Sequence, residues 1–186
     1  RFATELLLME HLSGRVDGPA GFALATGNDA PMAMRAHVAL KAFAAVDLKC
    51  ARCHDSPVDQ YKQRDLFLLA SYLKGGPLAV PATSVAAAGK VKEAESITTS
   101  LVSGQQIKPA GLKANWLPEH SETKSLNPLI PGSRAELAAL LTSPANSRFS
   151  DVIVNRMWKR LFGTGLVEPV DQWNGLPEPT HPKLLR

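Results

Sequence analysis

The chain contains only two cysteines among its 186 residues, which excludes the disulfide framework of small secreted domains. It has no run of about 20 uninterrupted apolar residues, so no transmembrane segment is expected in it. Lysines and arginines are scattered rather than clustered, and aromatic residues make up only 6% of the chain. This pattern argues against a nucleic-acid partner, because such surfaces need a dense basic patch.

What remains is the composition of an ordinary globular protein, 45% hydrophobic and 20% charged, with a formal net charge of +4. A chain of this length buries about two thirds of its unfolded surface and needs no metal or disulfide merely to fold. The apolar run after Arg1 and the residues before Arg186 do not resemble natural termini. We therefore expect a fragment or a processed product from which any signal peptide has been removed.

Hydrophobic periodicity and capping signals predict four helices and one strand. Pro31 suits a first helical turn, Gly75 and Gly163 suit helix ends, and Ser133 begins a capping box with Glu136. The stretch between the helix that ends before Gly75 and the helix that begins at Ser133 is rich in turn residues and is expected to be mostly irregular. The predicted helices are Pro31–Asp47, Arg64–Lys74, Ser133–Leu141 and Ser147–Phe162, and the predicted strand is Ile97–Val102.

The chemistry of the chain is expected at Cys50-Ala51-Arg52-Cys53-His54, which fits the haem attachment signature C-x-x-C-H. Two thiols separated by two residues lie on one helical turn and add to the two porphyrin vinyl groups as thioethers. The adjacent histidine supplies the proximal axial nitrogen to the iron. The sequence thus predicts one covalent haem c per chain, bound by Cys50, Cys53 and His54.

A C-x-x-C pair has two other common uses in proteins. A zinc site needs further cysteine or histidine ligands at short spacing, whereas the remaining histidines at 11, 37, 120 and 181 are dispersed. A dithiol of the thioredoxin type follows a strand in a βαβ pattern, which this helical region does not show. Both remain alternatives to haem.

Several stretches on both sides of the motif and in the last third of the chain occur together in one order: 46–49, 55–61, 63–73, 81–84, 133–146, 154–158, 161–167, 169–171 and 177–185. In these stretches the chain resembles the planctomycete-type cytochrome c domain proteins, which are built around two adjoining domains of unknown function. The likeness covers most of the chain and is weakest at 85–130. Where many relatives have a second histidine, this chain has Ser56, so any role of that histidine is absent or taken over elsewhere.

Composition and periodicity, taken with the resemblance, predict a mainly α fold with a cytochrome c-like haem lobe and a second small helical lobe joined by a long irregular segment. The expected boundaries are 1–84 for the haem lobe, 85–131 for the connector and 132–186 for the start of the second domain. The resemblance also implies a secreted or periplasmic protein, which agrees with the extracytoplasmic attachment of haem c in bacteria. A redox partner protein, and other parts of a larger polypeptide or complex, are the expected partners.

The motif does not identify the second axial ligand of the iron. His37, on the helix before the motif, is a candidate, and a partly exposed helical histidine is the alternative. For Met9, Met32 and Met34, apolar packing is favoured over a role as iron ligand. Met157 is expected in the core. Arg52 is a candidate for a haem propionate, with a carboxylate such as Asp55 or solvent as alternatives.

The function expected from these residues is single-electron transfer, because a haem with a fixed axial histidine keeps its geometry in both oxidation states. One alternative is a haem enzyme of a peroxidase-like or oxygen-handling type, in which the sixth coordination position stays open. The other is a structural or interaction module that a haem stabilises. We therefore expect an electron-transfer protein rather than a catalyst.

Overall fold

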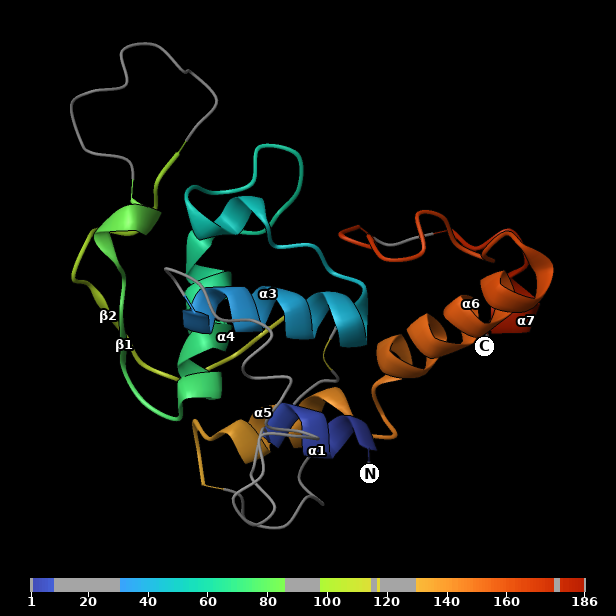
Figure 1. The fold of residues 1–186 in the computed structure, drawn as a ribbon, viewed down its shortest axis with the longest axis horizontal. Helices are drawn as coiled ribbons and strands as arrows, with labels where there is room; N and C mark the ends of the chain where they lie inside the picture. Colours follow the sequence, from blue (N-terminus) through green and yellow to red (C-terminus); the bar gives the residue numbers. More distant parts are fainter. Residues whose placement is uncertain are drawn as a thin grey trace.

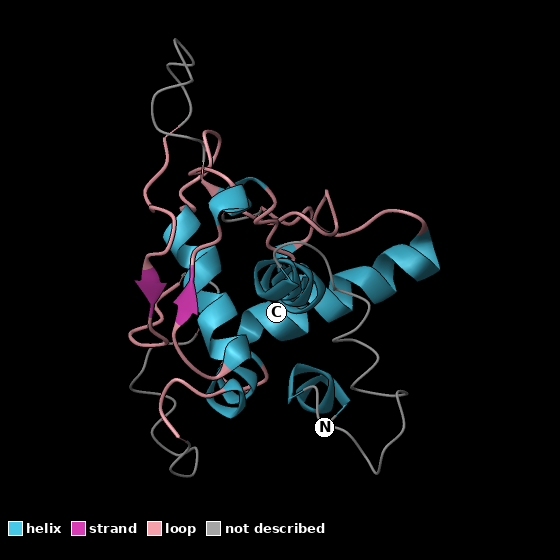
Figure 2. Cartoon of the chain, turned by 60° about the vertical axis from the view of Figure 1, so that its left-hand side comes forward, coloured by secondary structure: helices cyan, strands magenta, loops and turns pink. Residues whose placement is uncertain are grey.

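The computed structural model describes residues 2–8, 31–85, 98–114, 117, 130–175 and 178–185. Over these residues the protein is mainly α, as the sequence predicts, with a single two-stranded sheet (Figure 1, Figure 2). The elements are α1 (Phe2–Leu8), α3 (Pro31–Ala44), η1 (Cys50–Arg52), α4 (Gln63–Lys74), β1 (Leu78–Ala79), η2 (Ala82–Ser84), β2 (Gln106–Ile107), α5 (Arg134–Leu141), α6 (Ser147–Phe162) and α7 (Pro182–Leu185).

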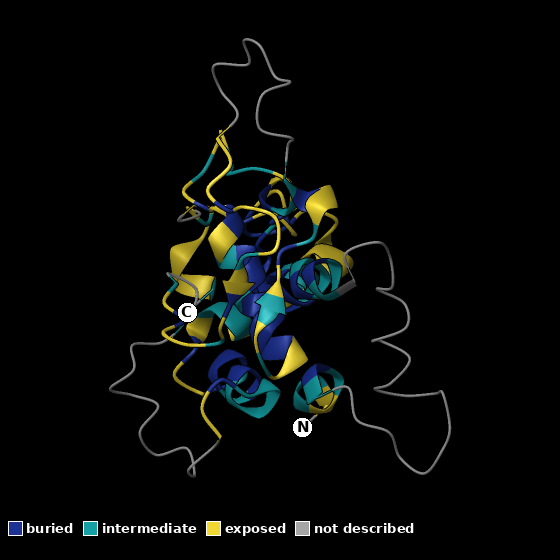
Figure 3. Cartoon of the chain, turned by 90° about the vertical axis from the view of Figure 1, so that its left-hand side faces the viewer, coloured by how far each residue is buried: buried dark blue, intermediate teal, exposed yellow. Residues whose placement is uncertain are grey.

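The centre of the fold is the pair α3 and α4, which pack against each other. The predicted apolar face of α3 is confirmed, since Ala36, Ala39 and Leu40 are at most 2% exposed. On α4 the predicted face is also buried, with Leu66 and Leu73 at the helix–helix contact region of the core. Figure 3 shows the buried residues gathered along the inner sides of these helices. The 3.6-residue period therefore located the core correctly.

The end of α3 differs from the prediction. The helix ends at Ala44 rather than at Asp47, and Ala45 has a positive φ of 52°. The carbonyl oxygens of the last turn are bound by side chains of α6: Arg148 Nε donates to Ala44 O at 2.9 Å, and Arg156 donates to Lys41 O and Ala42 O. A long-range partner thus satisfies the helix end, which no local signal in the sequence reveals.

The predicted strand at 97–102 is not found over its described part, residues 98–102. The amides of this segment bind side chains instead of a neighbouring strand. Ser100 N and Leu101 N donate to Gln63 Oε1 at 3.1 and 3.4 Å. The sheet forms later in the chain, where β1 pairs antiparallel with β2 and Leu78 lies opposite Ile107.

Helices α1 and α5 lie side by side (Figure 1). The Ser133 hydroxyl accepts the Glu136 amide at 3.1 Å, which is one half of the predicted capping box. The Glu136 carboxylate accepts the Gly132 amide at 2.6 Å instead of the Ser133 amide, which donates to Ile130 O. Leu137 and Leu141 of α5 belong to the same apolar core as α3 and α4. The core is therefore continuous across segments that are far apart in sequence.

Helix α6 has the predicted bounds, but most of its large apolar residues lie outside its buried face. Val152 and Asn155 are its buried residues, whereas Met157 is 54% and Leu161 is 71% exposed. The expectation that Met157 packs in the core is therefore wrong. Trp158 stacks on Phe162 along this outer side, with their ring centroids 4.3 Å apart.

The reason is that two arginines of α6 are directed inward. Arg148 and Arg156 bind the carbonyl end of α3, and Arg148 also lies over the Trp173 ring at 5.0 Å. The sequence predicted a basic exposed side for this helix, and part of that basic side is the docked one. The guanidinium groups donate hydrogen bonds to the free carbonyls at the end of α3, which apolar side chains cannot do. These bonds therefore favour the orientation in which the arginines of α6 face α3.

None of the described helices combines the length and the apolar character that crossing a bilayer requires.

Candidate functional site

The C-x-x-C-H residues form a short turn after α3. Cys50–Arg52 is a 3-10 helix, and the amides of Cys53 and His54 both donate to the Cys50 carbonyl, at 3.1 and 3.2 Å. Ala51 points into the core with 1% exposure, while both cysteines are exposed and unpaired. The buried methyl group fixes the turn against α4, so the two thiols face solvent.

His54 is half-buried, and its ring is oriented by the backbone. Its Nδ1 lies 2.7 Å from the carbonyl oxygen of Asp55. A carbonyl oxygen only accepts, so Nδ1 carries the hydrogen and donates. The lone pair is then on Nε2, which is the tautomer that an imidazole needs to bind a metal through that nitrogen.

Asp55 joins this turn to two other segments. Its amide donates to Thr98 O at 2.7 Å, and its Oδ1 accepts the Gln63 amide at 2.9 Å at the start of α4. The same Oδ1 accepts the Ser100 hydroxyl at 2.6 Å. The motif is therefore fastened to α4 and to the returning end of the segment that follows η2.

The loop around the motif is also bound by the last third of the chain. Asn174 Nδ2 donates to Asp47 O at 2.8 Å and to the Asp59 carboxylate, while Asn174 Oδ1 accepts the Asp47 amide at 2.8 Å. Gln60 Nε2 donates to the Asn174 carbonyl at 3.1 Å. Residues on both sides of the C-x-x-C-H turn are held by one asparagine.

His37 has the opposite tautomer preference to His54. Its Nδ1 accepts the Leu48 amide at 3.3 Å, so its hydrogen is on Nε2 when the ring is neutral. Burial lowers the pKa of His37 below its ordinary value, although the nearby Asp47 carboxylate raises it. Binding iron through Nε2 requires this bond to break, and in the structure His37 ties α3 to the loop that enters the motif.

The other predicted site residues are placed as follows. Arg52 ends η1 and is half-buried, and Ser56 donates its amide to the Tyr61 carbonyl at 2.8 Å. Met32 and Met34 are half-buried on α3, and Arg35 Nη1 lies 3.9 Å from the Met32 sulfur. The methionine candidate Met9 and the dispersed histidines His11 and His120 lie outside the described residues.

Two polar contacts bind α6 to the segment that follows it. Asn155 Nδ2 donates to Val167 O at 2.8 Å, and its Oδ1 accepts the Val167 amide at 2.9 Å. Arg156 and Asp171 form an ion pair with a nitrogen–oxygen distance of 2.7 Å. Trp173, in the same segment, is buried.

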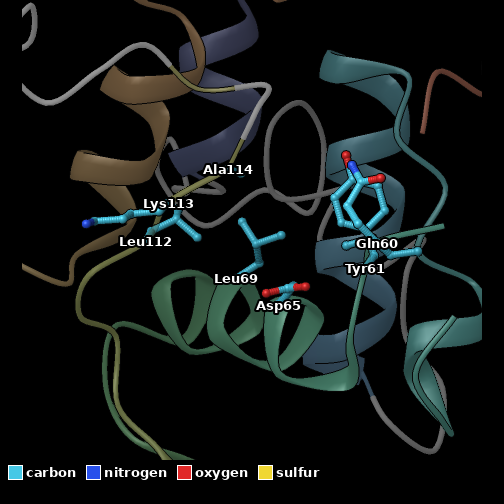
Figure 4. Close-up of a pocket in the computed structure, with 8 residues that line it drawn as sticks. Gln60, Tyr61, Asp65, Leu69, Leu112, Lys113 and Ala114 are labelled. Atoms are coloured by element: carbon cyan, nitrogen blue, oxygen red, sulfur yellow. The ribbon is translucent and has the colours of Figure 1, made fainter. Parts of the chain in front are cut away.

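A pocket of about 160 Å³ lies beside the loop, between α4 and residues 112–114 (Figure 4). Figure 4 shows Gln60 and Tyr61 on one side of it and Leu112 and Lys113 on the other. It is smaller than the roughly 300–1,000 Å³ of most ligand sites. The lining residues of this pocket include neither of the cysteines nor His54, so the pocket is separate from the C-x-x-C-H turn.

Two family models match the chain. Residues 21–76 match PSCyt2, described as a protein of unknown function (DUF1549), and residues 133–186 match PSD1, described as a protein of unknown function (DUF1553). The expected pair of adjoining domains of unknown function is therefore found. The first match includes the C-x-x-C-H turn, and the second includes α5, α6 and Asn174. No curated protein and no solved structure matches the chain.

Sequence reasoning missed three residues that hold this site: Gln63, Ser100 and Asn174. Gln63 is fully buried, and its side-chain amide binds Ser84 O, Ser100 N and Leu101 N. A glutamine at a helix start carries no distinctive signal. Asn174 follows a tryptophan in a polar stretch, and nothing local indicates that it reaches Asp47.

Proposed function

We propose that the chain is a c-type cytochrome unit in which Cys50 and Cys53 bind one haem through thioethers and His54 is the proximal iron ligand. The observation that carries the proposal is the pairing of two exposed thiols on one turn with an imidazole whose Nδ1–H is already held by a carbonyl. These are the donors and the tautomer that such a group requires. A bound haem supplies a one-electron couple.

Each residue of the chain then has a defined task. The cysteines would hold the haem through thioethers, and His54 would present Nε2 from a ring held by its bond to the Asp55 carbonyl. Asp55 and Asn174 hold the backbone on either side of the turn. A rigid environment of this kind suits electron transfer, because little reorganisation accompanies the change of oxidation state. We propose a periplasmic or secreted location and a redox partner protein.

The attachment is tested by exporting the full chain in a bacterium that makes c-type haem, then denaturing it in acid acetone and staining a gel for haem. The matched control is the Cys50→Ala, Cys53→Ala double variant. Haem that stays with the wild-type chain and is lost from the double variant supports the proposal. Haem that extracts freely from a folded wild-type chain overturns it.

The function is tested by measuring whether the sixth coordination position of the iron is occupied. A reduced spectrum with sharp low-spin bands, a reversible midpoint potential and no carbon monoxide uptake support electron transfer. A high-spin iron that binds carbon monoxide indicates an open position and favours a haem enzyme. A haem that cannot be reduced and reoxidised reversibly, yet raises the melting temperature, favours a structural role.

A further inference from the structure

The amide, the carboxylate and the carbonyl of Asp55 all make hydrogen bonds. Its amide donates to Thr98 O, its Oδ1 accepts from Gln63 N and Ser100 Oγ, and its carbonyl accepts His54 Nδ1–H. Two of these bonds, at 2.6 Å to Ser100 Oγ and 2.7 Å to Thr98 O, join Asp55 to the segment at 98–100, which is distant in sequence. The peptide that orients the His54 ring is therefore fixed from a distance.

The same segment is fastened a second time by Gln63. The Gln63 Oε1 accepts the amides of Ser100 and Leu101, while its Nε2 donates to Ser84 O at 2.7 Å. Gln63 and Ser84 are fully buried, and Leu101 is 2% exposed. One side chain thus joins Ser84 to residues 100 and 101.

A buried amide with all its partners in place is rigid, because breaking any of these bonds leaves a desolvated polar group. Displacing residues 98–101 would move Thr98 O and Ser100 Oγ, which both hold Asp55. The Asp55 carbonyl would then lose its alignment with His54 Nδ1. Placement of this segment and orientation of the imidazole are therefore mechanically connected.

We propose that Asp55 is a positioning residue through which segment 98–101 sets the tautomer and the donor strength of His54. The inference rests on the proposed function insofar as His54 binds iron. A firm Nδ1–H to carbonyl bond makes the imidazole a better donor, which favours ferric iron and lowers the midpoint potential. Residues far from the motif in sequence thereby tune the site.

The first test needs no haem. The full chain is produced haem-free and checked for its helical circular dichroism, and the His54 tautomer is read by nitrogen-15 NMR. The wild type is expected to hold its hydrogen on Nδ1. Ser100→Ala should shift the tautomer ratio toward Nε2–H by about fivefold, the factor that one net hydrogen bond supplies.

Two further variants make the test specific. Asp55→Asn keeps an oxygen acceptor at the same position and should retain the wild-type ratio, whereas Asp55→Ala should lose it. Ser150→Ala is the matched control for Ser100→Ala, because the Ser150 hydroxyl binds only within its own helix, at Ser147 O. This control should leave the tautomer unchanged.

The second test uses the haem-loaded chain. Ser100→Ala should raise the midpoint potential and speed solvent exchange of the His54 Nδ1 hydrogen, and Ser150→Ala should do neither. Haem attachment with an unchanged tautomer, potential and exchange rate in Ser100→Ala overturns the positioning role and leaves the proposed function standing. A chain that takes up no haem, yet shows the tautomer shift, overturns the iron ligand and leaves the positioned imidazole standing.

Discussion

Asp47 and Asn174 form a reciprocal pair across 127 positions of the chain: the Asp47 amide donates to Asn174 Oδ1, and Asn174 Nδ2 donates to the Asp47 carbonyl, both at 2.8 Å. The pair resembles one rung of an antiparallel ladder built from a side-chain amide. It connects one matched family segment to the loop that carries the C-x-x-C-H turn in the other. The two segments are therefore joined at the site as well as at the end of α3, where Arg148 and Arg156 bind.

Asn174→Ala should lower the free energy of unfolding by about 2 kcal/mol, because it leaves the amide and carbonyl of Asp47 without partners in a half-buried place. Urea denaturation measures the change. Gln172→Ala, two residues away and exposed, is the control and should change stability by less than about 0.5 kcal/mol. Equal effects of the two substitutions would contradict the importance of this pair.

Arg148→Met should destabilise the fold by about 3 kcal/mol. Its guanidinium binds Ala44 O at the end of α3 and the Trp173 carbonyl, and bonds from charged groups each contribute about 1.5–3 kcal/mol. Burial lowers the pKa of Arg148, which shows how far it is removed from water. Arg160→Met, an exposed arginine on the same helix, is the matched control.

In Arg148→Met the free energy is measured by denaturation, and the docking of α6 on α3 is monitored separately by limited proteolysis. We expect faster cleavage near residue 145 in Arg148→Met than in Arg160→Met. If both variants keep the wild-type stability and cleavage rate, helix-end binding by arginine does not hold α6 in place.

His37 should make the stability depend on pH. Burial lowers its pKa from 6.5, against the raising effect of Asp47 and with the help of Lys41 and Lys49. The unfolded chain then takes up a proton first as pH falls. His37 therefore contributes stability that is present above pH 6.5 and is lost as pH falls from there toward its lower folded pKa.

The test compares the wild type with His37→Asn between about pH 7.5 and pH 5. Asparagine keeps an oxygen that accepts the Leu48 amide but has no proton to gain. The difference in unfolding free energy between the two proteins should shrink or reverse toward acidic pH. Parallel pH profiles would show that His37 titrates alike in the folded and unfolded states. Asp47, whose pKa is lowered by its Lys41 and Lys49 hydrogen bonds despite the opposing effect of burial, titrates below this window.

Replacing one cysteine of the motif should leave a single thioether. Intact mass after denaturation should show one haem on the wild type, one haem at reduced yield on Cys50→Ala and on Cys53→Ala, and none on the double variant. The reason is that each carbon–sulfur bond is covalent by itself and survives without the other. Haem covalently retained by the double variant would show that another residue holds it.

Local signals predicted the parts of the fold that depend on local bonds. Ser133 caps α5, Gly75 and Gly163 end α4 and α6 with positive φ, and the 3.6-residue period marks the buried face of α3. The same signals failed at α3 beyond Ala44, because its final carbonyls are bound by arginines more than one hundred positions away. They also failed at residues 98–102, whose amides pair with side chains rather than with a strand.

By itself the sequence determined the C-x-x-C-H turn, since five consecutive residues fix which atoms one helical turn brings together. It also determined most helix limits, because caps and glycines act within a few residues of where they stand. Only the tertiary structure decided that the His54 ring is held through Asp55 from Thr98 and Ser100, and that Asn174 fastens Asp47. Those bonds form when the packing of the core brings distant backbone together, and local spacing carries no record of that geometry.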